Sequence, residues 1–271
     1  MPQNEAEWKQ AATDVTRSMR DFTKPFVTPL SKVLSPEEGE LLGTGGYITA
    51  LGKIMLITND HNFEKLDINQ IGAQFFGNDH VFMLHHITYS TKYPFDVGFT
   101  LINPAVWNLP KLQPHNAVAI PQTKLAPAHK PVENELLFLK GYALQESKFL
   151  FNTLMSNATS YTGKEVPLPE RWEHPFHFAI DYRPDLAEEL DPGYSLPRPD
   201  GLSGSLVWNT HYVECASQGF EWQPEFAEVT GIVWGWPSGG ACLIATRIEY
   251  VRSYLAHALD DMAARGEITV T

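Results

Sequence analysis

Short β-prone segments separated by glycine and proline recur along most of this chain, and they limit its fold more than any other feature. The chain contains 19 Gly and 20 Pro among its 271 residues. The clearest segments are 46–61, 74–89, 95–103, 115–122, 135–144, 175–182, 204–210, 227–236 and 241–247. Short strands at this spacing are typical of antiparallel barrels or sandwiches and argue against β-α-β units. The sequence therefore predicts an all-β protein.

Amphipathic helices are expected at both ends of the chain. Near the N-terminus, apolar residues recur at steps of three and four: Trp8, Ala12, Val15, Met19 and Phe22. Pro25 and Pro29 are expected to end this helix, which either docks on the body or serves as an interaction arm. The matching stripe near the C-terminus consists of Ile248, Val251, Leu255, Leu259 and Met262, with Gly266 as its stop.

The middle of the chain suggests a boundary between two β units. Six prolines lie between Pro104 and Pro131, enough for an extended connector. We expect an N-terminal helix at 1–30, a first β unit at 31–115, a second at 116–247, and a C-terminal helix and tail at 248–271.

Charge and composition exclude several classes of partner. The formal net charge is -12, from 20 Lys+Arg against 32 Asp+Glu. Nucleic acids and anionic membranes both need a basic patch, so neither is expected as the main partner. The first residues lack the apolar run of a signal peptide, and no stretch approaches the roughly 18 apolar residues of a membrane span. Cys215 and Cys242 are expected to be two buried free thiols, with a single disulfide as the alternative. Cytoplasmic residence is the expectation.

The segment Gly201-Leu202-Ser203-Gly204-Ser205 places one serine between two glycines, directly before an apolar run. Taken alone, this is a common turn composition. A serine hydroxyl becomes a good nucleophile only when a base removes its proton and an acid orients that base. Ser203 as a nucleophile therefore needs a histidine and a carboxylate elsewhere in the chain.

His61 and Asp96 are the best candidates for these two groups. His61 ends the run "IMLITNDH", in which a buried strand leads into a polar turn. Asp96 begins "DVGFTLI", in which alternation predicts a strand, so its carboxylate would lie at the strand mouth. Three rival acids, Asp60, Asp67 and Asp79, are less favoured; Asp60 points away from His61 if that segment stays extended.

The three candidates follow one another along the chain in the order His, Asp, Ser, and this order differs between classes of serine hydrolase. In this order and in the segments quoted below, the chain resembles the trypsin-like (chymotrypsin-fold) serine peptidases of bacterial type. "GTGGYITALGKIMLITNDH" is similar to their segment before the base, "FDVGFTLI" to their aspartate strand and "GLSGSLVW" to their nucleophile loop. "VTGIVWGW" resembles their substrate-side strand, and "ACLIATRIEYVRSYL" their last strand and C-terminal helix. The matching segments are separate stretches spread over residues 40 to 260, roughly, and the resemblance is loose over 105–195.

The resemblance implies two antiparallel six-stranded β-barrels with the active site between them. It implies that His61 is the general base, Asp96 its orienting acid and Ser203 the nucleophile. The backbone N–H groups of Gly201 and Ser203 would form the oxyanion hole. The substrate-binding strand would contain Trp234, Gly235 and Trp236.

Three positions depart from the family pattern. Leu202 stands where digestive members have an aspartate that pairs with a freed N-terminal amine, so activation by that route is excluded. Ser205 replaces a glycine of the nucleophile loop. Trp234 and Trp236 could narrow the substrate pocket. Residues 197–199 supply no acid at the pocket base, so a preference for Lys or Arg is not expected.

The expected function is that of a serine endopeptidase acting on peptide or protein substrates, without a metal or cofactor. His80, His85 and His86 lack the spacing of a zinc site. A latent or inactive peptide-binding module of the same fold, needing a regulatory protein partner, is the alternative. An α/β-hydrolase is disfavoured because "LVWNTHYVE" after Ser203 reads as a strand, whereas a nucleophile elbow opens a helix.

Overall fold

The structure, a computed structural model, describes most of the chain. The described residues are 4–35, 38–64, 66–78, 80–86, 88–109, 115–150, 153–187, 190, 193, 195–237 and 241–268. Asp79, one of the acids weighed against Asp96, lies outside them.

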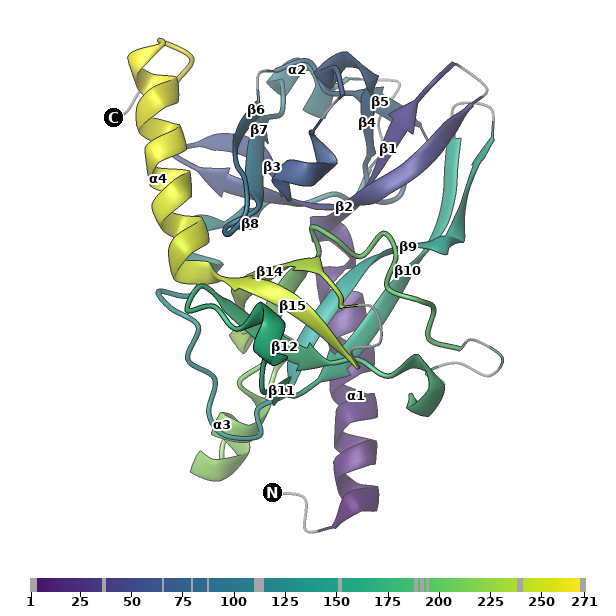
Figure 1. Cartoon of the computed structure of the whole chain (residues 1–271), viewed down its shortest axis with the longest axis vertical. Coiled ribbons are helices and arrows are strands. Elements are labelled where there is room, and N and C mark those ends of the chain that lie inside the picture. Colours follow the sequence, from purple (N-terminus) through teal and green to yellow (C-terminus); the bar gives the residue numbers. More distant parts are fainter. Residues whose placement is uncertain are drawn as a thin grey trace.

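The first half of the chain forms one sheet, which occupies the upper half of Figure 1. Its described strands are β1 (Val27–Val33), β2 (Gly39–Ala50), β3 (Lys53–Thr58), β4 (Ile71–Gln74), β5 (Val81–Met83), β6 (Thr88–Thr91), β7 (Val97–Leu101) and β8 (Ile120–Pro121). They pair antiparallel in the order β5-β4-β1-β2-β3-β7-β6, and β8 joins β2 in parallel. The predicted turn at Leu51 and Gly52 joins β2 to β3, with positive φ at both residues.

The second half forms the other sheet, in the lower half of Figure 1. Its described strands are β9 (Leu137–Leu150), β10 (Thr153–Gly163), β11 (Glu165–Val166), β12 (His177–Asp181), β13 (Leu206–Asn209), β14 (Glu228–Gly235) and β15 (Cys242–Arg247). They pair antiparallel in the order β10-β9-β13-β14-β15-β12-β11. β10 therefore lies at one edge of this sheet.

Helices cover the two ends of the body. The α-helices are α1 (Glu5–Thr23), α2 (Pro104–Trp107), α3 (Tyr212–Gln218) and α4 (Ile248–Ala264). The 3-10 turns are η1 (Lys24–Phe26), η2 (Asp60–Asn62), η3 (Ile68–Gln70), η5 (Gln122–Lys124), η6 (Glu170–Trp172), η7 (Pro184–Leu186) and η8 (Pro224–Phe226). α1 packs against β9 and β10, whereas α4 leaves the second sheet and runs up beside the first (Figure 1). Among the described residues, no helix is long and apolar enough to cross a membrane.

The N-terminal helix α1 ends at Thr23, two residues before Pro25, the first of the two prolines expected to end it. Pro29, the second, lies inside strand β1, which the sequence did not predict. Pairing of β1 with β4 begins at Leu30, so the proline precedes that ladder, where its missing N–H is tolerated. The predicted C-terminal helix is confirmed, and the positive φ of Gly266 follows its end.

One apolar cluster joins the two sheets to the two long helices. It includes Met19 of α1, Ile48 and Phe99 of the first sheet, Ile232 of the second and Leu255 of α4, all buried. Removing this surface from water supplies the main driving force that holds the halves together. The docked form of the N-terminal helix is therefore the one observed.

The structure confirms an all-β fold of two mainly antiparallel sheets with a helix at each end. In the described part of the chain the sheets have eight and seven strands rather than six each, counting the two-residue strands β8 and β11. The division between 115 and 116 stays a prediction.

The two halves approach each other closely at Gly204. Its φ is 90°, and a Cβ there would collide with the carbonyl oxygen of Thr44 and with Thr58 Oγ1 in the first sheet. Only glycine therefore lets the loop before β13 reach the other half.

We predict that Gly204→Ala lowers the free energy of unfolding by about 3 kcal/mol or more, since a left-handed alanine costs about 1–2 kcal/mol and overpacking about 1–3 kcal/mol more. Gly219→Ala is the matched control, because Gly219 also has a positive φ but nothing lies within 4 Å of its added Cβ. Urea unfolding of both variants measures the difference. Equal losses would contradict the proposed collision.

Candidate active site

His61 follows the buried strand β3 on the 3-10 turn η2. β3 is buried over its last four residues and pairs with β7, with Thr58 opposite Gly98. This register brings the residues after β3 beside Asp96, which directly precedes β7. Asp60 was disfavoured as the acid on the assumption that this segment is extended. The segment is instead a 3-10 turn that begins at Asp60.

His61 and Asp96 are in direct hydrogen-bond contact. His61 Nδ1 lies 2.6 Å from Asp96 Oδ2, and the backbone N–H of His61 donates to Asp96 Oδ1 at 3.1 Å. A carboxylate acceptor at Nδ1 favours the tautomer with its proton on Nδ1, which leaves Nε2 as a proton acceptor. The Asp96 side chain is 9% exposed and that of His61 40%, so the acid is sealed while the imidazole reaches solvent.

The turn that carries Asp96 is anchored from both sides. Asp96 has a φ of 47°, a left-handed conformation that aspartate tolerates better than most residues. Asn59 Nδ2 donates to its carbonyl oxygen at 2.7 Å. The buried amide therefore holds the backbone of Asp96 while the backbone of His61 holds its carboxylate.

Ser203 is tied to the first sheet beside His61. The N–H of Thr44 donates to the Ser203 carbonyl at 2.8 Å, and Thr44 Oγ1 donates to the Gly201 carbonyl at 3.0 Å. Asn62, the residue after His61, donates to the Ser203 carbonyl at 3.4 Å. The serine loop and the His61 turn thus share one junction.

In the part of the chain that the structure describes, two of the five N–H groups of the serine loop, residues 201–205, have no protein acceptor. The other three have backbone acceptors: Leu202 with Pro199, Gly204 with Val233, and Ser205 with Leu202. The N–H groups of Gly201 and Ser203 donate in no hydrogen bond among the described residues. A φ of 95° at Gly201 accompanies this arrangement. Unpaired backbone donors on one short loop are able to bind an oxyanion.

The hydroxyl of Ser203 is only weakly held. Its Oγ donates to the Trp234 carbonyl at 3.4 Å, beyond the usual range for a hydroxyl hydrogen bond. No bond between this oxygen and His61 is among those of the described residues. The structure therefore pairs His61 with Asp96 and places the loop of Ser203 against the turn of His61, through the bond of Asn62 to the Ser203 carbonyl.

A second anchor of the Asp96 turn comes from the second sheet, and the sequence analysis missed it. His177 Nε2 donates to the Pro94 carbonyl at 2.6 Å, and Thr246 Oγ1 donates to the Phe95 carbonyl at 2.7 Å. His177 is 1% exposed, and burial lowers the pKa of its imidazole. No local pattern marks either residue, because each bond spans a large distance along the chain.

The three residues expected to bind substrate point in different directions. The indole of Trp234 contacts the rings of Tyr93, Trp172 and His177, at centroid distances of 5.8, 5.6 and 5.1 Å. Trp236 packs on the core of the second sheet, with the guanidinium of Arg198 5.7 Å from its ring. Gly235, between them, has nothing within 4 Å of an added Cβ. The space on the Cβ side of Gly235 is therefore open, while its backbone pairs with Ile244 of β15.

The two departures in the serine loop have structural explanations. Leu202 is fully buried in the apolar core of the second sheet, so its side chain needs no charged partner. Ser205 is also buried, and a Cβ on Gly141 would collide with its hydroxyl oxygen. Glycine at 141 makes the space that serine at 205 requires, a pairing that the sequence analysis did not detect.

Strand β13 begins three residues after Ser203, so no helix opens at the serine. This excludes the α/β-hydrolase elbow.

Cys215 and Cys242 are both free, as expected, although Cys215 is only half-buried. Burial raises the pKa of each thiol. Raised values leave both as thiols rather than reactive thiolates near neutral pH.

Comparison with known proteins supports the fold. No protein-family model matches the chain, and no curated protein matches it by sequence. A solved structure of a scabies mite inactivated protease paralogue has a TM-score of 0.55 at 12% identity, covering 90% of this chain and 97% of its own. A protease from M. tuberculosis matches in its active and inactive forms, each with a TM-score of 0.50, 16% identity and 90% of this chain covered, and with 85% and 92% of its own chain covered.

At these identities the likeness establishes the fold and no more. The chain has the trypsin-like (chymotrypsin) fold of two packed β units. Because one of these neighbours is an inactivated paralogue, the fold alone does not decide activity.

The buried His177 predicts a pH dependence of stability. Its pKa in the folded protein lies below the ordinary value of 6.5, so the unfolded state binds the proton more tightly. The unfolding free energy should therefore fall as the pH drops below about 6.5, by at most about 1.4 kcal/mol per pH unit.

The variant His177→Gln keeps a donor for the Pro94 carbonyl but removes the titration, and it should flatten the dependence between pH 7 and 5. His257→Gln, at an exposed histidine on α4, should retain it. Urea unfolding across this range measures both. An unchanged slope in His177→Gln would refute the assignment.

Proposed function

We propose that this protein is a serine endopeptidase that cleaves peptide bonds through an acyl-enzyme, with Ser203 as nucleophile, His61 as general base and Asp96 as the orienting acid. The observation that carries the proposal is the 2.6 Å contact of His61 Nδ1 with the sealed carboxylate of Asp96, beside a loop with two free N–H groups. A buried carboxylate paired with an open imidazole is the arrangement that proton transfer at a serine requires.

In the proposed reaction, Ser203 Oγ attacks the carbonyl carbon of the scissile bond while His61 Nε2 accepts the hydroxyl proton. The negative charge moves to the carbonyl oxygen, where the N–H groups of Gly201 and Ser203 would stabilise it by roughly 3 kcal/mol per donor. His61 then gives its proton to the departing amine, and the acyl group remains on Ser203. Water, deprotonated by His61, releases the acid product. Asp96 keeps its charge throughout and stabilises the imidazolium.

The end of β14 around Gly235, where the space on the Cβ side is open, would hold the substrate, with Trp234 and Trp236 on either side. The rings beside Trp234 form an apolar wall, and near Trp236 lies the cation of Arg198, which is paired with Asp200 at 3.5 Å. A substrate with Lys or Arg at the cleavage site would meet this cation, so we do not expect a trypsin-like preference.

A latent or inactive peptide-binding module is the second candidate. The bond of Ser203 Oγ to the Trp234 carbonyl, in place of one to His61, favours it. In this form a regulatory protein partner would shift the serine toward the imidazole.

The cellular location of the protein and its classes of partner are also proposals. The free thiols fit a reducing compartment, so we place the protein in the cytoplasm. The net charge of -12 gives no reason to add nucleic acid or membrane to its partners.

Labelling by a fluorophosphonate tests the proposal. We predict that the folded protein forms a covalent adduct at Ser203, located by mass spectrometry of its peptides. Ser203→Ala should abolish the adduct, and Asp96→Asn should slow peptide hydrolysis by about 10⁴-fold because it leaves the imidazole in the wrong tautomer. Ser217→Ala, at an exposed serine on α3, is the control and should label normally.

A folded sample that stays unlabelled from pH 6 to 9 would refute the active enzyme. Peptide binding without turnover, retained in Ser203→Ala, would then support the latent module.

A further inference from the structure

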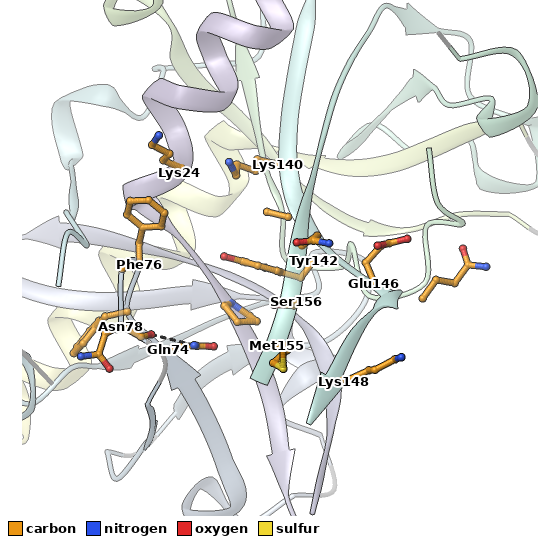
Figure 2. Close-up of a pocket in the computed structure, with 16 residues that line it drawn as sticks. Lys24, Gln74, Phe76, Asn78, Lys140, Tyr142, Glu146, Lys148, Met155 and Ser156 are labelled. Carbon is orange, nitrogen blue, oxygen red and sulfur yellow. Dashed lines mark hydrogen bonds between the residues drawn. The ribbon is translucent and has the colours of Figure 1, made fainter. Parts of the chain in front are cut away.

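A cavity of about 790 Å³ lies between the β9–β10 hairpin and the loop that follows β4. Figure 2 shows Tyr142 near its middle, Phe76 and Asn78 from the first sheet on one side, and Met155 and Ser156 of β10 on the other. His61, Asp96 and Ser203 are not among its lining residues. The cavity is therefore separate from the candidate active site.

The cavity is basic, although the protein as a whole is acidic. Three lysines line it, Lys24, Lys140 and Lys148, against one lining carboxylate, that of Glu146; Lys24 is also paired with Asp21, outside the lining, at 3.3 Å. The whole chain has 20 Lys+Arg against 32 Asp+Glu. This contrast of charge favours an anionic occupant.

Lys140 is the buried member of this group. It is 7% exposed, and its ammonium donates to the Arg20 carbonyl at 3.1 Å, which uses one of three N–H groups. Burial, together with the cations of Arg20 and Lys24, lowers the pKa of Lys140 to about 8, and Asp21 opposes the shift. An anion bound beside it would stabilise its charged form.

The shape of the wall favours a peptide over a small anion. Among the described strands, β10 pairs with β9 alone and forms the edge of its sheet, and residues 155–158 of this edge line the cavity. The pairing of β9 with β10 is interrupted there, between Ser156 and Ala158. An open strand edge presents backbone donors and acceptors that an extended peptide is able to pair with.

The neighbouring strand β9, which also lines the cavity, is connected to the serine loop. Thr44 Oγ1, which holds the Gly201 carbonyl, accepts from the N–H of Tyr142, and the N–H of Leu144 donates to the Asp200 carbonyl at 2.7 Å. Gln145 accepts from the N–H of Arg198 at 2.8 Å. Residues 142–145 therefore lie between the cavity and the loop that contains Ser203.

We propose that this cavity binds an acidic peptide segment of a partner protein, through the lysines and the open edge of β10, and that the bound segment steadies the serine loop through residues 142–145. Peptide binding at the cavity does not depend on the proposed function. An effect of that binding on catalysis rests on the proposed function, because it requires Ser203 to be the nucleophile.

The test uses the full chain and a fluorescein-labelled peptide of alternating glutamate and valine. Fluorescence anisotropy should show saturable binding that weakens at least tenfold in Lys140→Met and in Lys148→Gln. The first variant replaces a buried lysine by an apolar residue of similar length; the second alters an exposed side chain, so the test does not depend on one variant folding. Lys130→Gln, at an exposed lysine outside the lining, should bind as the wild type does.

Hydrogen exchange gives a readout that does not require activity. The bound peptide should slow exchange at two amides: that of Leu144, which donates to the Asp200 carbonyl just before the serine loop, and that of Leu202 within the loop, which donates to the Pro199 carbonyl. Absence of binding, binding that both lysine variants retain, or displacement by inorganic phosphate at the same concentration as by unlabelled peptide would overturn the peptide site. Binding with unchanged exchange at both amides would overturn the connection to the loop.

Discussion

Thr44 is the junction on which the arrangement of the candidate active site depends. It is fully buried in β2, and its N–H holds the Ser203 carbonyl. Its hydroxyl donates to Gly201 and accepts from Tyr142, and its carbonyl accepts from Thr58 Oγ1 at 2.7 Å. A buried polar network of this kind is stable only when each member is paired, so small displacements are costly. One side chain of the first half thereby sets the position of the serine loop of the second.

The second half in turn positions Asp96, the acid of the first half. Asp96 belongs to the first half, but the turn before it is held by His177 and Thr246 of the second sheet. Each half therefore positions a group that the other half presents. Because the shared apolar core fixes the distance between the halves, packing and hydrogen bonding act on the same geometry. This reciprocity explains how the pair of His61 and Asp96 and the loop of Ser203 come to lie at one junction despite their separation along the chain.

The features that were predicted correctly from the sequence are those that a local pattern of residues determines. The β2–β3 turn follows from Leu51 and Gly52, the helices from their apolar stripes, and the approach of His61 to Asp96 from a strand end facing a strand start. Strand β1 escaped prediction because Pro29 suggested a break in regular structure rather than a strand, although β1 lies between β4 and β2. Strand β10 escaped because its serines and asparagine obscure any alternation. The partnership of Gly141 with Ser205 and the junction at Thr44 depend on residues about 60 and 160 positions apart, which no periodicity reports. The roles of His61, Asp96 and Ser203 in catalysis stay predictions.

The measurement that tests the junction most directly is the rate of fluorophosphonate labelling in Thr44→Val. Valine matches the shape of threonine but removes the hydroxyl, which frees the Gly201 carbonyl and the Tyr142 N–H. Thr44→Ser, which keeps the hydroxyl, is the matched control, and thermal unfolding of each variant establishes that it is folded. Our account predicts that folded Thr44→Val labels at least tenfold more slowly than the wild type, while Thr44→Ser labels at nearly the wild-type rate. Equal rates in all three proteins would contradict the claim that Thr44 sets the position of Ser203.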